Sequence, residues 1–365
     1  MALARTYARE RRRLLPVSLV LSAGYFFGWW ALVQGPLVAW LGTHVASFDL
    51  QVLIFMALFG LGGVLVGLPL DAYEHTRSVH YGLSVQTWRS WWADLLKGLA
   101  VAAVLGLPLV LGLYRLLAVA PTTWWLWAGL FYLVITVLLA QLAPVLIMPL
   151  FFKFTPYEDE GLTPRLAAVA AAAGTQVAGV FRTNLSSKTT AANAWLSGMG
   201  RTRRIVLGDT LLEKYPADEI VAIFAHEMGH HVHNDLWRGI AVSSAVSLVG
   251  FWIAAQVLAV AVAYFGYSGP ADLAAFPFLV LVLAAFGFVT SPLLSAYSRH
   301  QEWAADRYAL THGPGPAACA DAFTRLANQN LADPEPPRWQ VWFSYSHPPI
   351  LQRIAAAERP TTTDD

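Results

Sequence analysis

The chain has 365 residues, of which 56% are hydrophobic and only 13% are charged, and its formal net charge is +1. Soluble globular domains carry about 25% charged residues, so this composition excludes an ordinary soluble domain and predicts an integral membrane protein. The small net charge gives no basic surface for a nucleic-acid partner. The single cysteine, Cys319, excludes an internal disulfide framework, and we interpret it as a structural residue.

Six apolar runs are long enough to cross a bilayer, which takes about 20 helical residues. Tryptophan pairs such as Trp29-Trp30 and Trp124-Trp125 stand near the ends of these runs, as is typical of the membrane–water interface. The spans are expected at about residues 14–34, 50–70, 96–119, 124–150, 239–266 and 272–297.

The spans divide the chain into four expected parts. These are an N-terminal membrane domain of four spans at 1–150, a polar insert at 151–238, two further spans at 239–297, and a mostly helical polar section at 298–365.

The distribution of Lys and Arg predicts the orientation in the membrane. These residues concentrate at the N-terminus, in 71–95 and in 151–238, whereas the loops 35–49 and 267–271 have none. Because cytoplasmic loops carry an excess of Lys and Arg, we expect both termini and the polar insert to be cytoplasmic. The protein is expected to be a multi-pass component of the cytoplasmic (cell inner) membrane.

The polar insert predicts a small α+β unit. An Ala-rich helix is expected at 163–173 and short strands at 177–184 and 204–207. The segment 191–198 between these strands could be an edge strand or a plain loop.

An H-E-x-x-H motif follows the predicted strands, with His226, Glu227 and His230 as its defined residues. Pro216 and the acidic residues after it are a helix-start signal, so the motif is expected inside a helix. Residues four apart share a helix face, so both histidines can bind one metal ion. Glu227 lies about 100° around the helix, where it can reach a metal-bound water. Zinc is the expected ion.

A catalytic zinc site of this kind needs a third protein ligand, and Glu302 is the candidate, just after the last span. Asp306 is four residues later and shares its helix face. One carboxylate would bind zinc and the other would orient a ligand imidazole through its second nitrogen. The alternative interpretation of the pair is a solvated acidic face. His231 is expected to point away from the ligand face.

Further motifs stand in order along the chain. They are Leu68-Pro69-Leu70-Asp71 with Tyr81-Gly82, Ile147-Met148-Pro149-Leu150-Phe151 with Lys153-Phe154-Thr155-Pro156, Asn193-Ala194-Trp195, Arg203-Arg204-Ile205-Val206-Leu207-Gly208-Asp209-Thr210-Leu211, Glu302-x-x-x-Asp306 and Ser346-His347-Pro348-Pro349 with Arg353. Together with the H-E-x-x-H motif, this ordered set resembles the type I CaaX prenyl proteases, which are integral-membrane zinc metallopeptidases of the gluzincin group. The resemblance covers most of the chain.

The apolar runs predict a mostly α, polytopic membrane protein of about six spans. The resemblance implies a cytoplasmic α+β zinc protease section of gluzincin type. It implies one Zn²⁺ per chain and the following roles. His226, His230 and Glu302 would bind zinc, Glu227 would be general base and then general acid, Asp306 would support the ligands, Asn193, Ala194 and Trp195 would bind extended substrate, and His347 and Arg353 would line the site, with His347 stabilising the oxyanion.

The expected function is that of a membrane-embedded zinc metalloendopeptidase acting on peptide or protein substrates at the bilayer. Extended C-terminal CaaX-like or membrane-associated segments are the candidate substrates. One alternative is a quality-control protease for misfolded membrane proteins. A second is a non-catalytic zinc-binding scaffold, which has no need for Glu227. A third, a transporter with a metal pathway, is disfavoured because the six runs hold almost no ionisable residues.

Overall fold

Six helices long and apolar enough to cross a membrane occur in the computed structural model, which describes residues 2–198 and 203–359. They cover Ala2–His44, Phe48–His80, Trp88–Val119, Trp124–Phe151, Asp235–Phe265 and Leu273–His312. The six predicted spans are therefore confirmed. The helices are longer than the apolar runs because polar residues continue each helix beyond the part that would lie in the hydrocarbon layer.

The first and fourth spans each contain a π-helical segment. In the first, α1 (Ala2–Gly28) passes through η1 (Trp29–Gln34) into α2 (Gly35–His44), and in the fourth, α5 (Trp124–Leu142) passes through η2 (Ala143–Ile147) into α6 (Met148–Phe151). The other spans are formed by α3 (Phe48–His80), α4 (Trp88–Val119), α10 (Asp235–Phe265), and η5 (Leu273–Ala275) with α11 (Phe276–His312).

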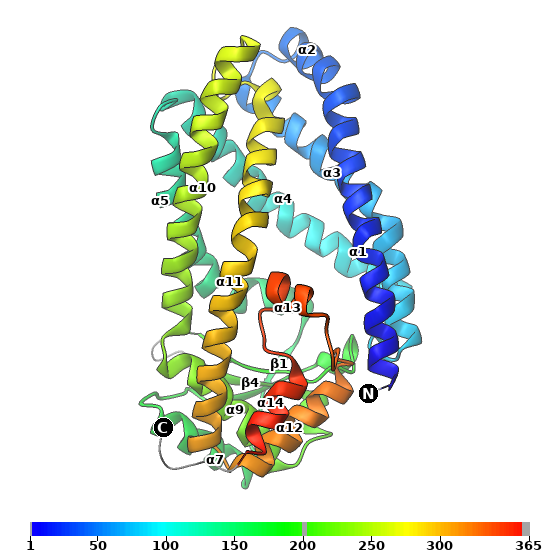
Figure 1. Ribbon diagram of the computed structural model, residues 1–365, viewed down its shortest axis with the longest axis vertical. Helices are drawn as coiled ribbons and strands as arrows, with labels where there is room; N and C mark the ends of the chain where they lie inside the picture. Colours follow the sequence, from blue (N-terminus) through cyan, green and yellow to red (C-terminus); the bar gives the residue numbers. More distant parts are fainter. Residues whose placement is uncertain (1, 199–202, 360–365) are drawn as a thin grey trace.

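The spanning helices form two groups (Figure 1). Helices α5, α10 and α11 pack side by side, α1 packs on α3 and α3 on α4, and a contact between α4 and α5 joins the groups. A buried cluster at the end remote from the sheet includes Trp29, Phe55, Trp124, Leu258 and Phe276. Aromatic and aliphatic packing between distant spans therefore holds that end together.

A four-stranded sheet lies at the opposite end of the molecule (Figure 1). Its order is β1 (Phe154–Pro156), β2 (Val180–Thr183), β4 (Arg204–Gly208) and β3 (Ala194–Ser197). Strands β2 and β4 are parallel and the other pairs are antiparallel. Both predicted strands are confirmed, with shifted bounds. The segment expected as either a strand or a loop is the edge strand β3.

The central helix of this end is α9 (Ala217–Val232), which packs against α7 (Leu162–Ala172), α11, α12 (Pro316–Gln329) and β3. The side chains of Phe224 and Met228 are fully buried on α9, as is Leu166 on α7. This apolar packing fixes the helix that carries the H-E-x-x-H motif. The remaining elements here are η3 (Leu185–Ser187), α8 (Asp209–Leu212), α13 (Arg338–Ser344) and α14 (Ile350–Ala357).

Two borders of the predicted four-part division fall within single helices and so do not coincide with a break in the chain's secondary structure. The border after 238 falls inside α10, and the border after 297 falls inside α11. The polar insert includes residues 199–202 and the last section includes 360–365, which lie outside the described residues. The division into domains stays a prediction.

Candidate metal centre and active site

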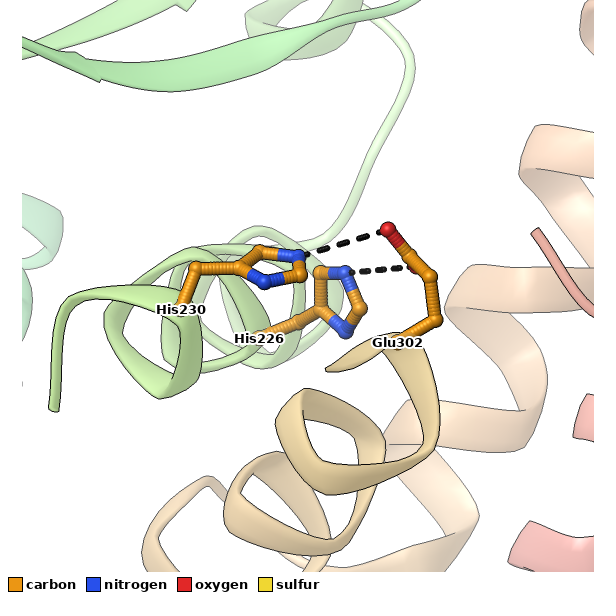
Figure 2. A group of neighbouring side chains, drawn as sticks. All are labelled: His226, His230 and Glu302. Carbon is orange, nitrogen blue, oxygen red and sulfur yellow. Dashed lines mark ion pairs between the residues drawn. The ribbon is translucent and has the colours of Figure 1, made fainter. Parts of the chain in front are cut away.

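Three side chains from two helices converge on one point (Figure 2). Helix α9 supplies His226 and His230, and α11 supplies Glu302. One ligand atom from each lies within 4.8 Å of the others. Nε2 of His226 is 3.4 Å from Oε2 of Glu302, and Nε2 of His230 is 3.4 Å from Oε1 of the same carboxylate. The structure thus brings together the three predicted metal ligands.

The separations of these atoms fit metal coordination better than hydrogen bonding. Two ligands that are each about 2.0–2.1 Å from a tetrahedral ion lie about 3.3 Å apart, whereas an N–H···O hydrogen bond has a mode near 2.9–3.0 Å. Oε2 of Glu302 is buried and accepts no hydrogen bond among the described residues. A buried carboxylate oxygen without a donor is costly, and a cation between the three side chains would remove that cost.

Each histidine also contacts a carboxylate of its own through Nδ1, the ring nitrogen that does not face Glu302. Nδ1 of His226 is 2.8 Å from Oδ1 of Asp306, as the spacing of Glu302 and Asp306 predicted. Nδ1 of His230 is 2.8 Å from Oδ2 of Asp235. These contacts leave Nε2 of both rings directed at Glu302 and favour the tautomer that a metal ion requires.

Asp235 was not found from the sequence. It is the first residue of α10, and a turn through Asn234, whose φ of 56° lies in the left-handed region, returns the chain toward the end of α9. Asn tolerates this conformation better than most residues. The Asn-Asp pair after the H-E-x-x-H helix was the signal that could have found this partner.

Arg353 lies behind the metal ligands. Its Nε and Nη2 donate to Oδ2 and Oδ1 of Asp306 at 2.8 and 2.6 Å, and its guanidinium carbon is 4.4 Å from the centre of the Phe323 ring. Nη1 is 4.0 Å from Oε2 of Glu302. This bidentate contact fixes the carboxylate that in turn fixes His226, so Arg353 from α14 links the C-terminal section to the centre.

A cavity of about 1000 Å³ opens beside the three-residue centre. Both His226 and Glu227 line it, as do Asn193 and Ala194 at the start of the edge strand. Trp195 does not lie among its described lining residues. The predicted role of Trp195 in substrate binding stays a prediction.

His347 enters the cavity from the loop between α13 and α14. Its Nε2 is 3.1 Å from Oε1 of Glu302, and its Nδ1 is 2.8 Å from Oγ of Ser346. Its side chain is 59% exposed, so this ring can contact a molecule bound in the cavity. His231, in contrast, contacts Nη1 of Arg203 at 3.2 Å, away from the ligand face, as predicted.

Burial and neighbouring charges shift the titration of the centre. Burial raises the pKa of Glu227 above its usual range, although positive charge on the two imidazoles opposes this shift. Burial lowers the pKa of His230, but the neighbouring carboxylates of Glu302 and Asp235 outweigh it and raise the pKa to about 9. The same carboxylates that attract a proton here would attract a metal cation.

The sequence of the same region matches a known family. Residues 156–361 match the sequence model described as "Peptidase family M48". The chain belongs to this family. Residues 2–153 match the model "CAAX prenyl protease N-terminal, five membrane helices"; the described part of this chain has four candidate spans there. The M48 member described here is therefore a membrane metalloprotease.

Relatives of this M48 protease share most of its length. The chain is 33% identical to "Uncharacterized metalloprotease YhfN" of Bacillus subtilis over 98% of its own length and 85% of the relative. It is 29% identical to "CAAX prenyl protease 1" of Saccharomyces cerevisiae over 86% of its own length and 74% of the relative. The crystal structure of S. mikatae Ste24p superposes with a TM-score of 0.87 at 26% identity, covering 98% of this chain and 88% of that one.

Proposed function

We propose that this protein is a zinc endopeptidase that hydrolyses extended peptide segments presented at the membrane. One observation carries the proposal: Glu227 and His226, which belongs to the His226/His230/Glu302 centre, line one cavity together with the edge of a sheet. The M48 family supports peptidase chemistry. Two imidazoles and one carboxylate are the ligand set of catalytic zinc sites that keep a fourth position open.

Bound zinc would supply a Lewis acid that polarises the scissile carbonyl and lowers the pKa of water. Glu227 would take the proton of the attacking water and deliver it to the leaving amine. Its raised pKa supports this role, because a general base works best when its pKa approaches the working pH. Asp306 and Asp235 would hold the ligand rings, and Arg353 would hold Asp306.

His347 would stabilise the oxyanion that develops on the scissile carbonyl. Its position on the cavity wall, 3.1 Å from Glu302, supports a role close to the metal centre. Removing one donor of this kind from other hydrolases costs about 10²–10³ in kcat.

Substrate would bind by adding a strand to the sheet. Strand β3 is at its edge, and Asn193 and Ala194 reach the cavity from the start of that strand. Main-chain hydrogen bonds would then give affinity without a strict sequence requirement. By likeness to CAAX prenyl protease 1, C-terminal CaaX-like segments are the first candidates, and other membrane-associated segments are the second. The basic residues of the polar insert support a site that faces the cytoplasm.

The test is hydrolysis of quenched fluorescent peptides by detergent-purified protein. We expect cleavage that stops when a zinc chelator is added and returns when zinc is restored in excess of the chelator. A matched pair of peptides, with and without a C-terminal Cys-aliphatic-aliphatic-X sequence, separates a CaaX-type protease from a general quality-control protease. Stoichiometric zinc binding with no cleavage of any peptide would contradict the proposal and favour a zinc-binding scaffold.

A further inference from the structure

The short helix α13 lies against the membrane-spanning part of α11 (Figure 1). The carbonyl oxygen of Phe343 accepts hydrogen bonds from Oγ of Ser291 at 2.9 Å and Oγ of Ser295 at 3.2 Å. The ring of Phe343 lies 4.6 Å, centre to centre, from the ring of Phe288. Helix α13 is therefore fixed to α11 by both backbone and side chain.

These contacts lie at membrane depth. Residues 276–298 of α11 include no charged side chain, and Arg299 is the first one. At 1.5 Å per residue, this uncharged run is about 34 Å long, which matches a bilayer core of about 30 Å. Phe288 lies about 16 Å along the helix from Arg299. A segment that contacts Phe288 therefore reaches well into the hydrocarbon layer.

The end of α13 has the hydrogen bonding that a site without water requires. The last carbonyl groups of a helix have no partner within the helix and usually bond to water, which the hydrocarbon layer does not contain. At the end of α13, side chains of α11 donate hydrogen bonds to these carbonyl groups in place of water. The serine hydroxyls bond to Phe343, and Nη1 of Arg299 donates to the carbonyl oxygens of Val341 and Tyr345, each at 2.7 Å.

Helix α13 has two different faces. Gln340 and Ser344 line the cavity of the metal centre. Trp339 and Trp342 are three residues apart on the other side and are 57% and 62% exposed. Arg338, in the first turn, is the helix's one charged side chain, and its length allows the guanidinium to reach the headgroup layer.

The exposed tryptophans are at the level of an apolar surface on α11. Phe288, Val289 and Leu293 of α11 are 66%, 69% and 71% exposed, as expected for a helix surrounded by lipid. At this depth two large exposed indoles would meet hydrocarbon, which is apolar like most of their ring surface. Trp342 is 6.3 Å, centre to centre, from Phe343, which meets Phe288, so the indoles lie at the depth of the hydrocarbon layer and acyl chains are the occupant that fits.

We propose that α13 is seated in the bilayer leaflet next to the metal centre, with Trp339 and Trp342 in contact with lipid acyl chains. Its opposite face, with Gln340 and Ser344, forms part of the cavity wall. A helix of the C-terminal section thereby separates the cavity from the lipid, and this placement does not depend on the proposed peptidase chemistry.

The test places an environment-sensitive fluorophore at position 342 of the full chain, as labelled Trp342→Cys reconstituted in lipid vesicles. We expect several-fold stronger quenching by lipids with a nitroxide on the acyl chain than at a water-exposed site, and weak quenching by aqueous iodide. The native Cys319 is 1% exposed, and burial raises the pKa of its thiol to about 11, so labelling is confined to the introduced cysteine.

Two matched positions calibrate the measurement. Val289→Cys on α11 reports lipid, and Ala167→Cys, at an exposed position of α7 at the sheet end, reports water. Trp339→Cys repeats the measurement if Trp342→Cys fails to fold, with the thermal unfolding midpoint in detergent as the folding check. Iodide quenching at 342 and 339 equal to that at 167 would overturn the proposal. Protection of both positions from both quenchers would also overturn it and indicate a protein partner.

Discussion

At the residue scale, each histidine of the centre is fixed by a carboxylate that is not among the described residues lining the cavity. The Nδ1 atoms of His226 and His230 are occupied by Asp306 and Asp235, and Arg353 holds Asp306. Glu227, by contrast, lines the cavity and is not among the three clustered ligands. We therefore expect substitution of Glu227 to change turnover, and substitution of Asp306 or Asp235 to change the affinity for zinc.

Glu227→Gln is expected to retain zinc and lose proteolysis. The amide keeps the size of the side chain but cannot take a proton from water, and general acid–base groups contribute about 10²–10⁴ to rate. Bound zinc is measured by elemental analysis and turnover with the fluorescent peptide. Wild-type turnover in this variant would contradict the assigned role.

Asp235→Asn and Asp306→Asn are each expected to weaken zinc binding by about 10–100-fold, because these carboxylates orient the ligand imidazoles. Competition with a chromogenic chelator measures the affinity. Asp218→Asn is the matched control, since Asp218 pairs with Arg165 on the surface. Equal affinities in all three variants would show that the two carboxylates do not support the metal.

At the element scale, the centre depends on how closely α9 approaches α11. A Cβ atom added at Gly229 would lie 2.7 Å from Cα and 3.0 Å from the carbonyl oxygen of Ala305. Such distances are shorter than van der Waals contact with backbone, which cannot rotate away. The glycine inside the H-E-x-x-H motif thus allows His226 and His230 to reach Glu302 on the neighbouring helix.

Gly229→Ala is therefore expected to destabilise the protein by about 1–3 kcal/mol, the usual cost of overpacking, and to weaken zinc binding. Thermal unfolding in detergent measures the first effect. Gly239→Ala in α10 is the matched control, because nothing lies within 4 Å of its added Cβ. A stability of Gly229→Ala equal to that of the control would contradict the close packing of the two helices.

At the scale of the whole molecule, zinc would join two parts of the chain that are distant in sequence. Helix α9 precedes the spanning helix α10, while Glu302 lies toward the C-terminal end of α11, the last spanning helix. A ligand that binds only the folded state stabilises it, by about 2.7 kcal/mol at 100 times its dissociation constant. The metal should therefore act as a cross-link between the sheet end and the spanning helices.

Removing zinc with a chelator is expected to lower the thermal midpoint of the wild-type protein, and added zinc should restore it. Glu302→Ala should show no response to zinc, whereas Glu227→Gln should respond like wild type because its ligands are intact. Differential scanning fluorimetry compares the three proteins. A zinc response in Glu302→Ala equal to that of wild type would rule out Glu302 as a ligand.

Local patterns in the sequence were enough to predict the spans and most of the centre. The six spans follow from the lengths of apolar runs, because a bilayer has a fixed thickness. His226 with His230, and Glu302 with Asp306, follow from the four-residue repeat of a helix face. These features depend on near neighbours in the chain, so the amino-acid order by itself determined them.

Only the tertiary structure decided the features that depend on packing between distant elements. Asp235 reaches His230 through a left-handed turn at Asn234, Arg353 meets Asp306 from another helix, and α13 lies against α11 at membrane depth. The choice of β3 as the edge strand likewise depends on which strands pair. No local repeat encodes these contacts, because the burial of apolar surface over the whole chain selects them together.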